Sequence, residues 1–252
     1  MLRLFLLISL LSALACQREP TPAAEPPAAA PANTPPAAKP EPPAQVAEPA
    51  AQTATPQPAV VPSTNAEVGK PAPDFTLTDT EGNTHQLSKL KDKLVVLEWF
   101  NPDCPFVRYA HTQGPLQDMA KRVAREDLIW LAVNSGAPGK QGHGLARNVE
   151  ARTQYGLAHP VLLDEQGVVG HAFGAEKTPH MAIIGPKGNV LYLGGIDNAP
   201  MGKVDPERPV PTGMEHGKQV NYVDEVLEDL QKGQPIRLPQ APSYGCSVKY
   251  AS

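Results

Sequence analysis

The chain has 252 residues, which is room for one ordinary domain with extensions or for two small domains. It contains 30 prolines but only 5% aromatic residues, a bias that indicates a segment unable to bury a hydrophobic core. The net charge is −4 and the basic residues form no long run, so we do not expect nucleic acid as a partner.

Residues 1–16 have the pattern of a bacterial export signal. Arg3 supplies a positive charge, and the apolar stretch Leu4–Leu14 is too short to span a bilayer but fits a secretory signal. A small residue followed by Cys16 resembles the lipobox, in which the Cys carries lipid and becomes the mature N-terminus. We expect an exported lipoprotein, anchored to a membrane and facing the periplasm or cell exterior. Ordinary cleavage after Ala15 is the alternative.

Residues 17–66 form a low-complexity segment with 14 Pro and 15 Ala. Proline removes backbone donors and favours polyproline II, so we expect a disordered, extended linker. A stalk that holds a domain away from a membrane and a spacer without a recognition role are both compatible with this composition.

Residues 67–252 have the composition and patterning of a folded domain. The sequence predicts a hairpin over 75–87, a buried strand over 94–100, a helix from 104 to about 125 broken at Gly114-Pro115, and a strand over 128–133. It then predicts a helix over 145–155, a strand over 161–163, a hairpin of strands 181–184 and 190–193, and a helix between Asn221 and Gly233. Alternating strands and helices indicate an α/β fold with helices on the faces of a sheet.

Cys104 is the centre of the predicted chemistry. It lies between a buried strand and a helix, where free N–H groups and the helix dipole lower the pKa of a thiol. Pro105 fits the first helical turn, where its missing donor costs nothing. A small buried Cys that only packs is the alternative, because free Cys is often buried.

Two further features accompany this cysteine. Glu98 lies inside the apolar strand, where a carboxylate is costly unless it is paired, solvated or protonated; an exposed face of the strand is the open alternative. Thr178-Pro179 precedes a predicted hairpin strand. A proline at the start of a strand is a place for a cis bond, whose geometry exposes backbone for a bound chain.

Four segments resemble the redoxin branch of the thioredoxin superfamily, also called the alkyl hydroperoxide reductase/thiol-specific antioxidant branch, and more closely its peroxiredoxin-like group. They are Gly69–Phe75, Asn101–Val107, Lys177–His180 and Pro242–Tyr250. The resemblance covers residues 67–252 and implies a thioredoxin-like fold, a central mixed sheet flanked by helices, with an N-terminal hairpin extension. It implies no cofactor and no metal.

The resemblance assigns roles residue by residue. Cys104 falls at the first Cys of the thioredoxin CxxC motif, Pro179 at its cis-proline, and Glu98 at the buried acid that shuttles protons. The second Cys position holds Val107, so a local disulfide cannot form. The hydroxyl position of the peroxiredoxin motif, counted from Cys104, holds Asn101, which does not suit peroxide positioning.

Cys246 is the remaining thiol of the domain and a candidate to replace the missing second cysteine. It lies in a proline-flanked segment that reads as an extended tail, and only the fold can bring it to Cys104. A separate surface thiol or a structural role are the alternatives.

We therefore expect an exported thiol-disulfide oxidoreductase of antioxidant type. Cys104 attacks, Cys246 or an external thiol resolves, Glu98 manages a proton, and Pro105, Thr178 and Pro179 contact the substrate. The expected partners are a thiol or disulfide protein or a small peroxide, an external thiol reductant, and a membrane through the lipid anchor. The alternative is a non-catalytic module, such as a copper carrier or assembly factor, in which His111 shares a helix face with Cys104.

Overall fold

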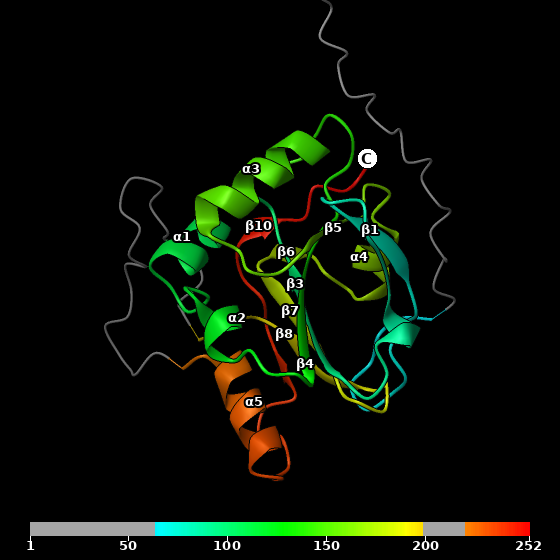
Figure 1. Ribbon diagram of the computed structural model, residues 1–252, viewed down its shortest axis with the longest axis vertical. Coiled ribbons are helices and arrows are strands. Elements are labelled where there is room, and N and C mark those ends of the chain that lie inside the picture. Colours follow the sequence, from blue (N-terminus) through cyan, green and yellow to red (C-terminus); the bar gives the residue numbers. More distant parts are fainter. Residues whose placement is uncertain (1–63, 199–219) are drawn as a thin grey trace, which may run out of the picture. The chain divides into compact units, whose positions relative to one another are not determined.

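The computed structural model describes residues 64–198 and 220–252, shown in colour in Figure 1. The predicted signal peptide, the lipidation at Cys16 and the linker up to residue 63 lie outside the described residues. The strands are β1 (Thr76–Asp79), β2 (Thr84–Gln86), β3 (Leu94–Trp99), β4 (Leu128–Asn134), β5 (Val161–Leu163), β6 (Lys177–Thr178), β7 (His180–Ile184), β8 (Val190–Gly194), β9 (Gln240–Ala241) and β10 (Cys246–Ser247). The helices are η1 (Leu87–Lys89), α1 (Pro105–Thr112), α2 (Met119–Arg122), α3 (Leu145–Tyr155), α4 (Val168–Ala172) and α5 (Tyr222–Gln231).

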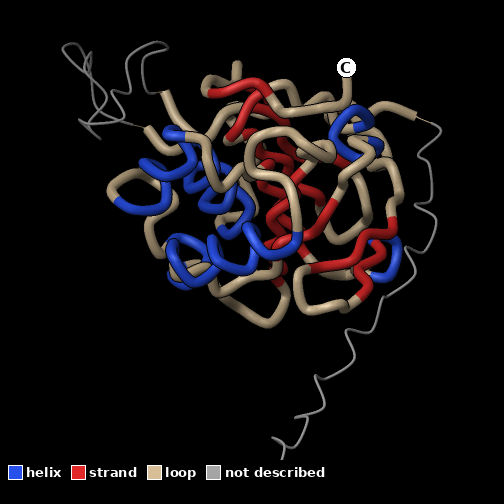
Figure 2. Tube along the Cα trace, turned by 90° about the horizontal axis from the view of Figure 1, so that it is seen from above, coloured by secondary structure: helices blue, strands red, loops and turns tan. Residues whose placement is uncertain are grey.

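A mixed sheet in the order β2-β1-β5-β4-β3-β7-β8-β9 forms the centre of this domain. The strands β3, β4 and β5 are parallel, whereas β7 runs antiparallel to β3 and forms a hairpin with β8. The N-terminal hairpin β1–β2 extends the sheet beyond β5, as the sequence predicts. Figure 2 shows the strands between helices on either side.

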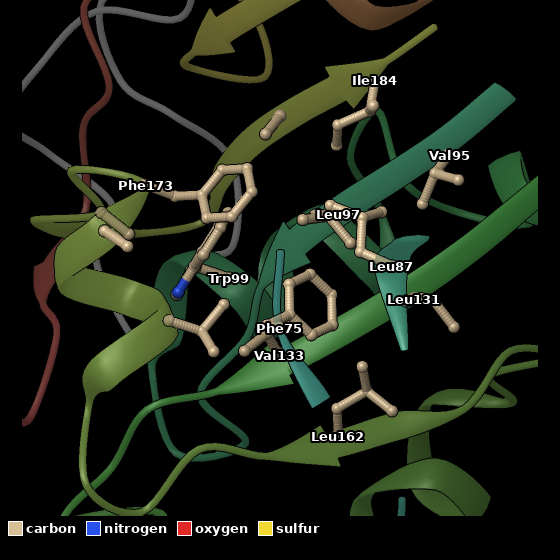
Figure 3. Close-up of a cluster of buried hydrophobic side chains, with 14 of the residues drawn as sticks. Phe75, Leu87, Val95, Leu97, Trp99, Leu131, Val133, Leu162, Phe173 and Ile184 are labelled. Atoms are coloured by element: carbon tan, nitrogen blue, oxygen red, sulfur yellow. The ribbon is translucent and has the colours of Figure 1, made fainter. Parts of the chain in front are cut away.

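The helices divide between the two faces of the sheet. Alternate side chains of β3, such as Leu97 and Trp99, join a core with Phe75 and Phe173 under the α4 segment (Figure 3). The opposite face carries α1, α2, α3 and α5 (Figure 1). Every residue of β3 is buried, since both faces of this strand are covered.

The predicted helix from 104 to 125 is two helices in the structure. The first, α1, ends at Thr112, and the chain turns at Gly114 and Pro115 before α2 begins at Met119. Pro115 has no N–H to continue the helical ladder, so the break predicted at this dipeptide is confirmed. The second helix, α2, has only four residues, and its Met119 is fully buried.

Five short elements were not predicted: η1, α4, β6 and the two tail strands β9 and β10. Each has five residues or fewer, which is too short for a periodic signal. The two strands lie in the C-terminal tail, where β9 pairs with β8 and β10 pairs with β6. Within residues 64–198 and 220–252 no helix is long and apolar enough to cross a membrane.

Candidate functional site

Cys104 stands at the junction of β3 and α1, as the sequence predicts. It is the N-cap residue of α1, with extended backbone angles of φ −80° and ψ 123°, and Pro105 takes the first helical position. The side chain of Cys104 is completely buried among Phe100, Val107 and the neighbouring apolar residues. The thiol therefore lies where the N-terminus of α1 faces the interior of the protein.

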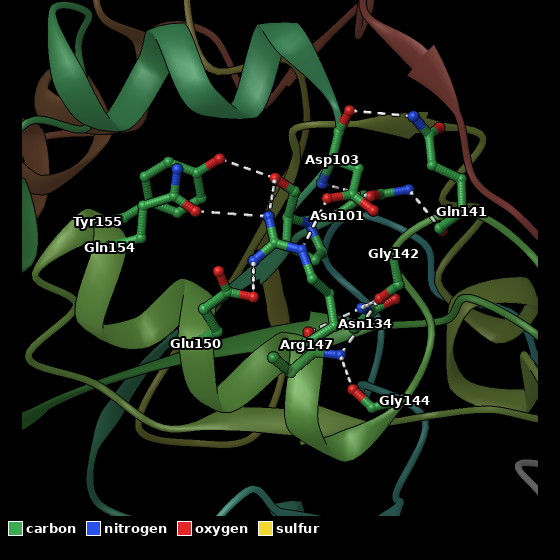
Figure 4. A network of polar contacts seen from close by, with 12 residues as sticks. Asn101, Asp103, Asn134, Gln141, Gly142, Gly144, Arg147, Glu150, Gln154 and Tyr155 are labelled. Atoms are coloured by element: carbon green, nitrogen blue, oxygen red, sulfur yellow. Dashed lines mark hydrogen bonds and ion pairs between the residues drawn. The ribbon is translucent and has the colours of Figure 1, made fainter.

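The loop that leads into Cys104 is fixed by polar contacts from α3 and its preceding loop (Figure 4). Arg147 Nε donates to Asp103 Oδ1 at 2.8 Å, and the Tyr155 hydroxyl donates to the Pro102 carbonyl at 2.7 Å. Within the loop, the Asp103 N–H donates to Asn101 Oδ1 at 2.9 Å. These contacts hold the turn that sets the direction of the Cys104 side chain, which gives Asn101 and its neighbours a positioning role.

The Thr178-Pro179 peptide bond is cis, which confirms the geometry expected at the start of this strand. The Cys104 sulfur lies 3.4 Å from the Thr178 carbonyl oxygen, to which the thiol donates when it is protonated. The cis-proline loop thus forms one wall of the thiol site.

The C-terminal tail forms another wall and brings the second cysteine to the first. Cys246 in β10 is the antiparallel partner of Thr178 in β6, and its thiol hydrogen-bonds to Cys104. Gly245 precedes it with φ +122°, and a Cβ atom there would lie 2.1 Å from the Thr178 carbonyl oxygen. Only glycine permits this close approach of the tail to the cis-proline loop.

Several contacts hold the tail on the domain beyond Cys246. The Val248 N–H donates to the Glu176 carbonyl, and the Ala137 N–H donates to the Lys249 carbonyl. The Tyr250 hydroxyl donates to the Ala175 carbonyl at 2.6 Å, while its ring stacks on His171 with centroids 3.9 Å apart. The tail is therefore an integral part of the domain.

The two cysteines influence each other's protonation. The hydrogen bond from Cys246 lowers the pKa of Cys104 to about 6, and it outweighs burial, which acts in the opposite direction. The Thr178 hydroxyl and the Val107 N–H also lower this pKa, because they favour the thiolate. The same thiol–thiol hydrogen bond raises the pKa of Cys246. Near neutral pH the negative charge therefore resides on Cys104 and the proton on Cys246.

Glu98 is fully buried, so the exposed face that the sequence left open does not occur. Burial alone would raise its pKa, but the ion pair and hydrogen bond with His111 bring the pKa below its usual value. The distance between His111 Nε2 and Glu98 Oε1 is 2.6 Å, and Trp130 Nε1 donates to the other carboxylate oxygen at 3.1 Å. The buried acid is held as a charged group.

His159, just before β5, is a member of this cluster that sequence reasoning missed. Its Nε2 lies 3.9 Å from Glu98 Oε2, and neither ring nitrogen has a hydrogen-bond partner in the described part of the chain. Burial lowers the pKa of His159 to about 4. Its sequence neighbours Ala158 and Pro160 belong to no recognisable motif. Only the three-dimensional structure shows that His159 lies beside Glu98.

Within the described residues, no three His, Cys, Asp or Glu side chains gather so that they could hold an ion. His111 points at Glu98 rather than acting as the free ligand that the copper alternative requires. The described partners of Glu98 are His111, Trp130 and His159, while Phe100 contacts His111 and packs with Cys104.

Comparisons with known proteins agree with this architecture. The family model described as Redoxin matches residues 67–203, more than half of the chain. The thiol-disulfide oxidoreductase ResA of Geobacillus kaustophilus (strain HTA426) is 32% identical over 131 residues, 52% of this chain and 70% of that protein. ResA of Geobacillus thermodenitrificans (strain NG80-2) is 33% identical over 132 residues, with the same two coverages.

Two solved structures resemble the domain over most of their length. A hypothetical protein of Sinorhizobium meliloti 1021 has a TM-score of 0.62 at 26% identity, covering 76% of this chain and 99% of that one. An uncharacterized conserved protein of Geobacillus kaustophilus has a TM-score of 0.60 at 27% identity, covering 77% and 97%. With its cis-proline, its Cys at the start of α1 and its mixed sheet, the chain has a thioredoxin-like fold and belongs to the Redoxin family.

Proposed function

We propose that this protein is a thiol-disulfide oxidoreductase whose redox pair is Cys104 and Cys246. The observation that carries the proposal is that the fold packs Cys246 against the cluster that contains Cys104 and pairs it with Thr178, although Val107 occupies the local second-cysteine position. The ResA relatives, named thiol-disulfide oxidoreductases, support the same reaction class.

The chemistry follows from the charge distribution of the pair. Cys104 is the thiolate at neutral pH and hence the nucleophile, and Cys246 is the thiol that resolves a mixed disulfide or sulfenic acid formed on it. Oxidation of the pair forms one S–S bond and releases two electrons and, because Cys104 is already a thiolate, one proton. A disulfide is the preferred oxidant, because Asn101 replaces the hydroxyl that positions a peroxide.

The remaining predicted site residues support the pair. Pro105 takes the first position of α1, and the Val107 N–H in the same turn favours the Cys104 thiolate. Thr178 and Pro179 hold a backbone segment against the thiol, and in the structure that segment is the chain's own tail. Glu98 and its histidine partners manage a proton within the domain during the redox cycle.

The site of action that we propose is outside the cytoplasm, with a lipid on Cys16 as the anchor and the periplasm or cell exterior as the compartment. The export pattern of residues 1–16 supports this location. Mass spectrometry of membrane fractions will show a lipid-modified N-terminal Cys16. A Cys16→Ala variant recovered in the same fraction as wild type would contradict the anchor.

The redox pair is tested with the full-length wild-type chain and two single variants. After treatment with oxidised glutathione, peptide mapping under non-reducing conditions should give a Cys104–Cys246 peptide pair in the wild type only. Insulin disulfide reduction should fall to background in Cys104→Ser and strongly in Cys246→Ser. Wild-type rates in Cys104→Ser, or a wild-type protein that never forms the linked peptides, would refute the proposal.

A further inference from the structure

The two cysteines of the pair differ in their exposure to solvent. Cys104 has no exposed surface at all, whereas Cys246 on the tail is partly exposed. A thiol-disulfide exchange step needs the attacking sulfur to reach the sulfur that it attacks. In the folded state only the Cys246 side of the pair offers such an approach.

The tail also blocks the route by which another chain would reach Cys104. The backbone of β6 next to the cis-proline is paired with β10, with Thr178 opposite Cys246 and Lys177 opposite Ser247. An external peptide cannot add to this edge while the tail is in place, because each backbone group pairs once along a given side. The contacts of Val248 and Tyr250 hold the tail there.

Two lysines lie close enough to Cys246 to act on it. Lys177 of β6 and Lys249 of the tail both act on Cys246 electrostatically, and both are partly exposed. Lys249 Nζ donates to the hydroxyl of the adjacent Ser247 at 3.3 Å. Glu176, the carboxylate next to Lys177 in the chain, acts on Tyr250. An incoming thiolate that carries further negative charge is therefore attracted to this end of the site.

We propose that external reductants attack the Cys104–Cys246 disulfide at the sulfur of Cys246, that Cys104 is the leaving thiolate, and that Lys177 and Lys249 favour anionic thiols. This inference rests on the proposed redox pair. It states which of the two sulfur atoms the external reductant attacks and which one leaves. It concerns only the reductive half of the cycle: the reductant reaches Cys246 with the tail in place, whereas the attack of Cys104 on a substrate disulfide requires β10 to separate from β6.

The electron balance is that of two successive exchanges. A thiolate RS⁻ bonds to the Cys246 sulfur, the Cys104–Cys246 bond breaks, and its electron pair leaves on Cys104. A second RS⁻ then bonds to the sulfur of the attached R group, releasing RS–SR and a Cys246 thiolate that takes a proton from solvent. Two thiols are oxidised and the cysteine pair gains two electrons. Cys104 is a good leaving group because the Val107 N–H and the N-terminus of α1 stabilise its thiolate.

The first experiment locates the mixed disulfide. Oxidised full-length wild-type protein is mixed with limiting reduced glutathione, quenched with acid at short times and mapped by mass spectrometry without reduction. We expect the glutathione adduct on the Cys246 peptide, in large excess over the Cys104 peptide. An adduct on Cys104, or equal amounts on both, would overturn the inference while leaving the redox pair intact. A protein that contains no Cys104–Cys246 disulfide at the outset would overturn the redox pair and the inference with it.

The second experiment tests the charge preference with two probes of opposite sign. In the Lys177→Gln/Lys249→Gln double variant, reduction of the disulfide by glutathione at low salt should slow by about tenfold. Reduction by the cationic thiol cysteamine should not slow. Lys187→Gln is the matched control, because this exposed lysine lies in the turn at the opposite end of β7. Equal slowing with both thiols, or no slowing with glutathione, would reject the role of the lysines.

Discussion

The carboxylate of Glu98 and the imidazole of His111 lie 2.6 Å apart in the interior of the domain, where neither side chain has more than 4% of its surface exposed. Glu98 comes from the central strand β3, and His111 from the second turn of α1, the helix that begins next to Cys104. The pair therefore ties the reactive helix to the sheet through a charged contact. Phe100 contacts the His111 ring and packs in the same cluster as Cys104.

Glu98→Gln should destabilise the domain by about 3 kcal/mol, because it removes one partner of a buried pair and leaves the other. The amide oxygen of the glutamine can still accept the hydrogen bond from Trp130. The loss of stability therefore measures the interaction with His111. Denaturant unfolding of both proteins measures the difference. Glu126→Gln is the control, since Glu126 is exposed and should change stability by less than about 0.5 kcal/mol. A Glu98→Gln protein as stable as the control would show that the buried pair contributes nothing.

Stability should fall when the pH is lowered from about 6.5 towards 4. Burial lowers the pKa of both His159 and His180 to about 4, whereas an unfolded histidine titrates near 6.5. Between these values the unfolded state binds more protons, so the contribution of each histidine is complete above about pH 6.5 and is lost as the pH falls. Glu98, whose pKa is lowered, contributes to acid unfolding only below about pH 4.5.

Urea unfolding across this range measures the effect, and His180→Phe provides the comparison. His180 packs against the edge of Trp99, so a phenyl ring fits its surroundings better than a polar side chain. The variant should lose less stability between about pH 6.5 and 4.5 than the wild type. Identical pH slopes in the two proteins would mean that His180 does not titrate on unfolding.

The elements that the sequence predicts well are those with a local signal. The alternation around Glu81-Gly82-Asn83 predicts the β1–β2 hairpin, and the continuous apolar run over 94–100 predicts the buried strand β3. The predicted bounds of α3 and β5 agree with the structure residue by residue. Each of these elements is determined by residues that are close in the sequence. Hydrophobic periodicity and turn residues are therefore enough to predict it.

The site depends on contacts between distant segments, which no periodicity reports. A carboxylate in an apolar strand indicates that Glu98 needs a partner, but His159 reaches it through the parallel pairing of β4 with β5. In the same way Cys246 reaches Cys104 only because β9 and β10 pair with β8 and β6. The sequence therefore predicts that Glu98 and Cys104 each require a partner side chain. Which residue is that partner is determined by the fold.

The thiolate at Cys104 should titrate with a pKa of about 6 in the wild type, as followed by its ultraviolet absorbance. Its largest cause is the hydrogen bond from Cys246, so Cys246→Ala should raise this pKa towards that of an ordinary thiol. Cys246→Ser retains a hydroxyl donor and should give an intermediate value. The same pKa in all three proteins would mean that the helix and Thr178 alone stabilise the thiolate.

Gly245→Ala should separate the two cysteines without changing either thiol. At this position φ is +122°, and an added Cβ would lie 2.1 Å from the Thr178 carbonyl oxygen, so β10 must move away from β6. A displacement of this size should slow Cys104–Cys246 disulfide formation roughly a hundredfold. Quantifying the linked peptides at timed intervals after addition of oxidised glutathione measures the rate.

Gly188→Ala is the matched control for this variant. Gly188 also has a positive φ, +78°, but no atom lies within 4 Å of an added Cβ, so alanine there introduces backbone strain without a clash. Both variants should lose about 1 kcal/mol of stability from the strained backbone. Only Gly245→Ala should lose the rapid disulfide, because only its Cβ forces the tail off the cis-proline loop. Equal disulfide rates in the two variants would show that Cys246 does not need the β6–β10 pairing to reach Cys104.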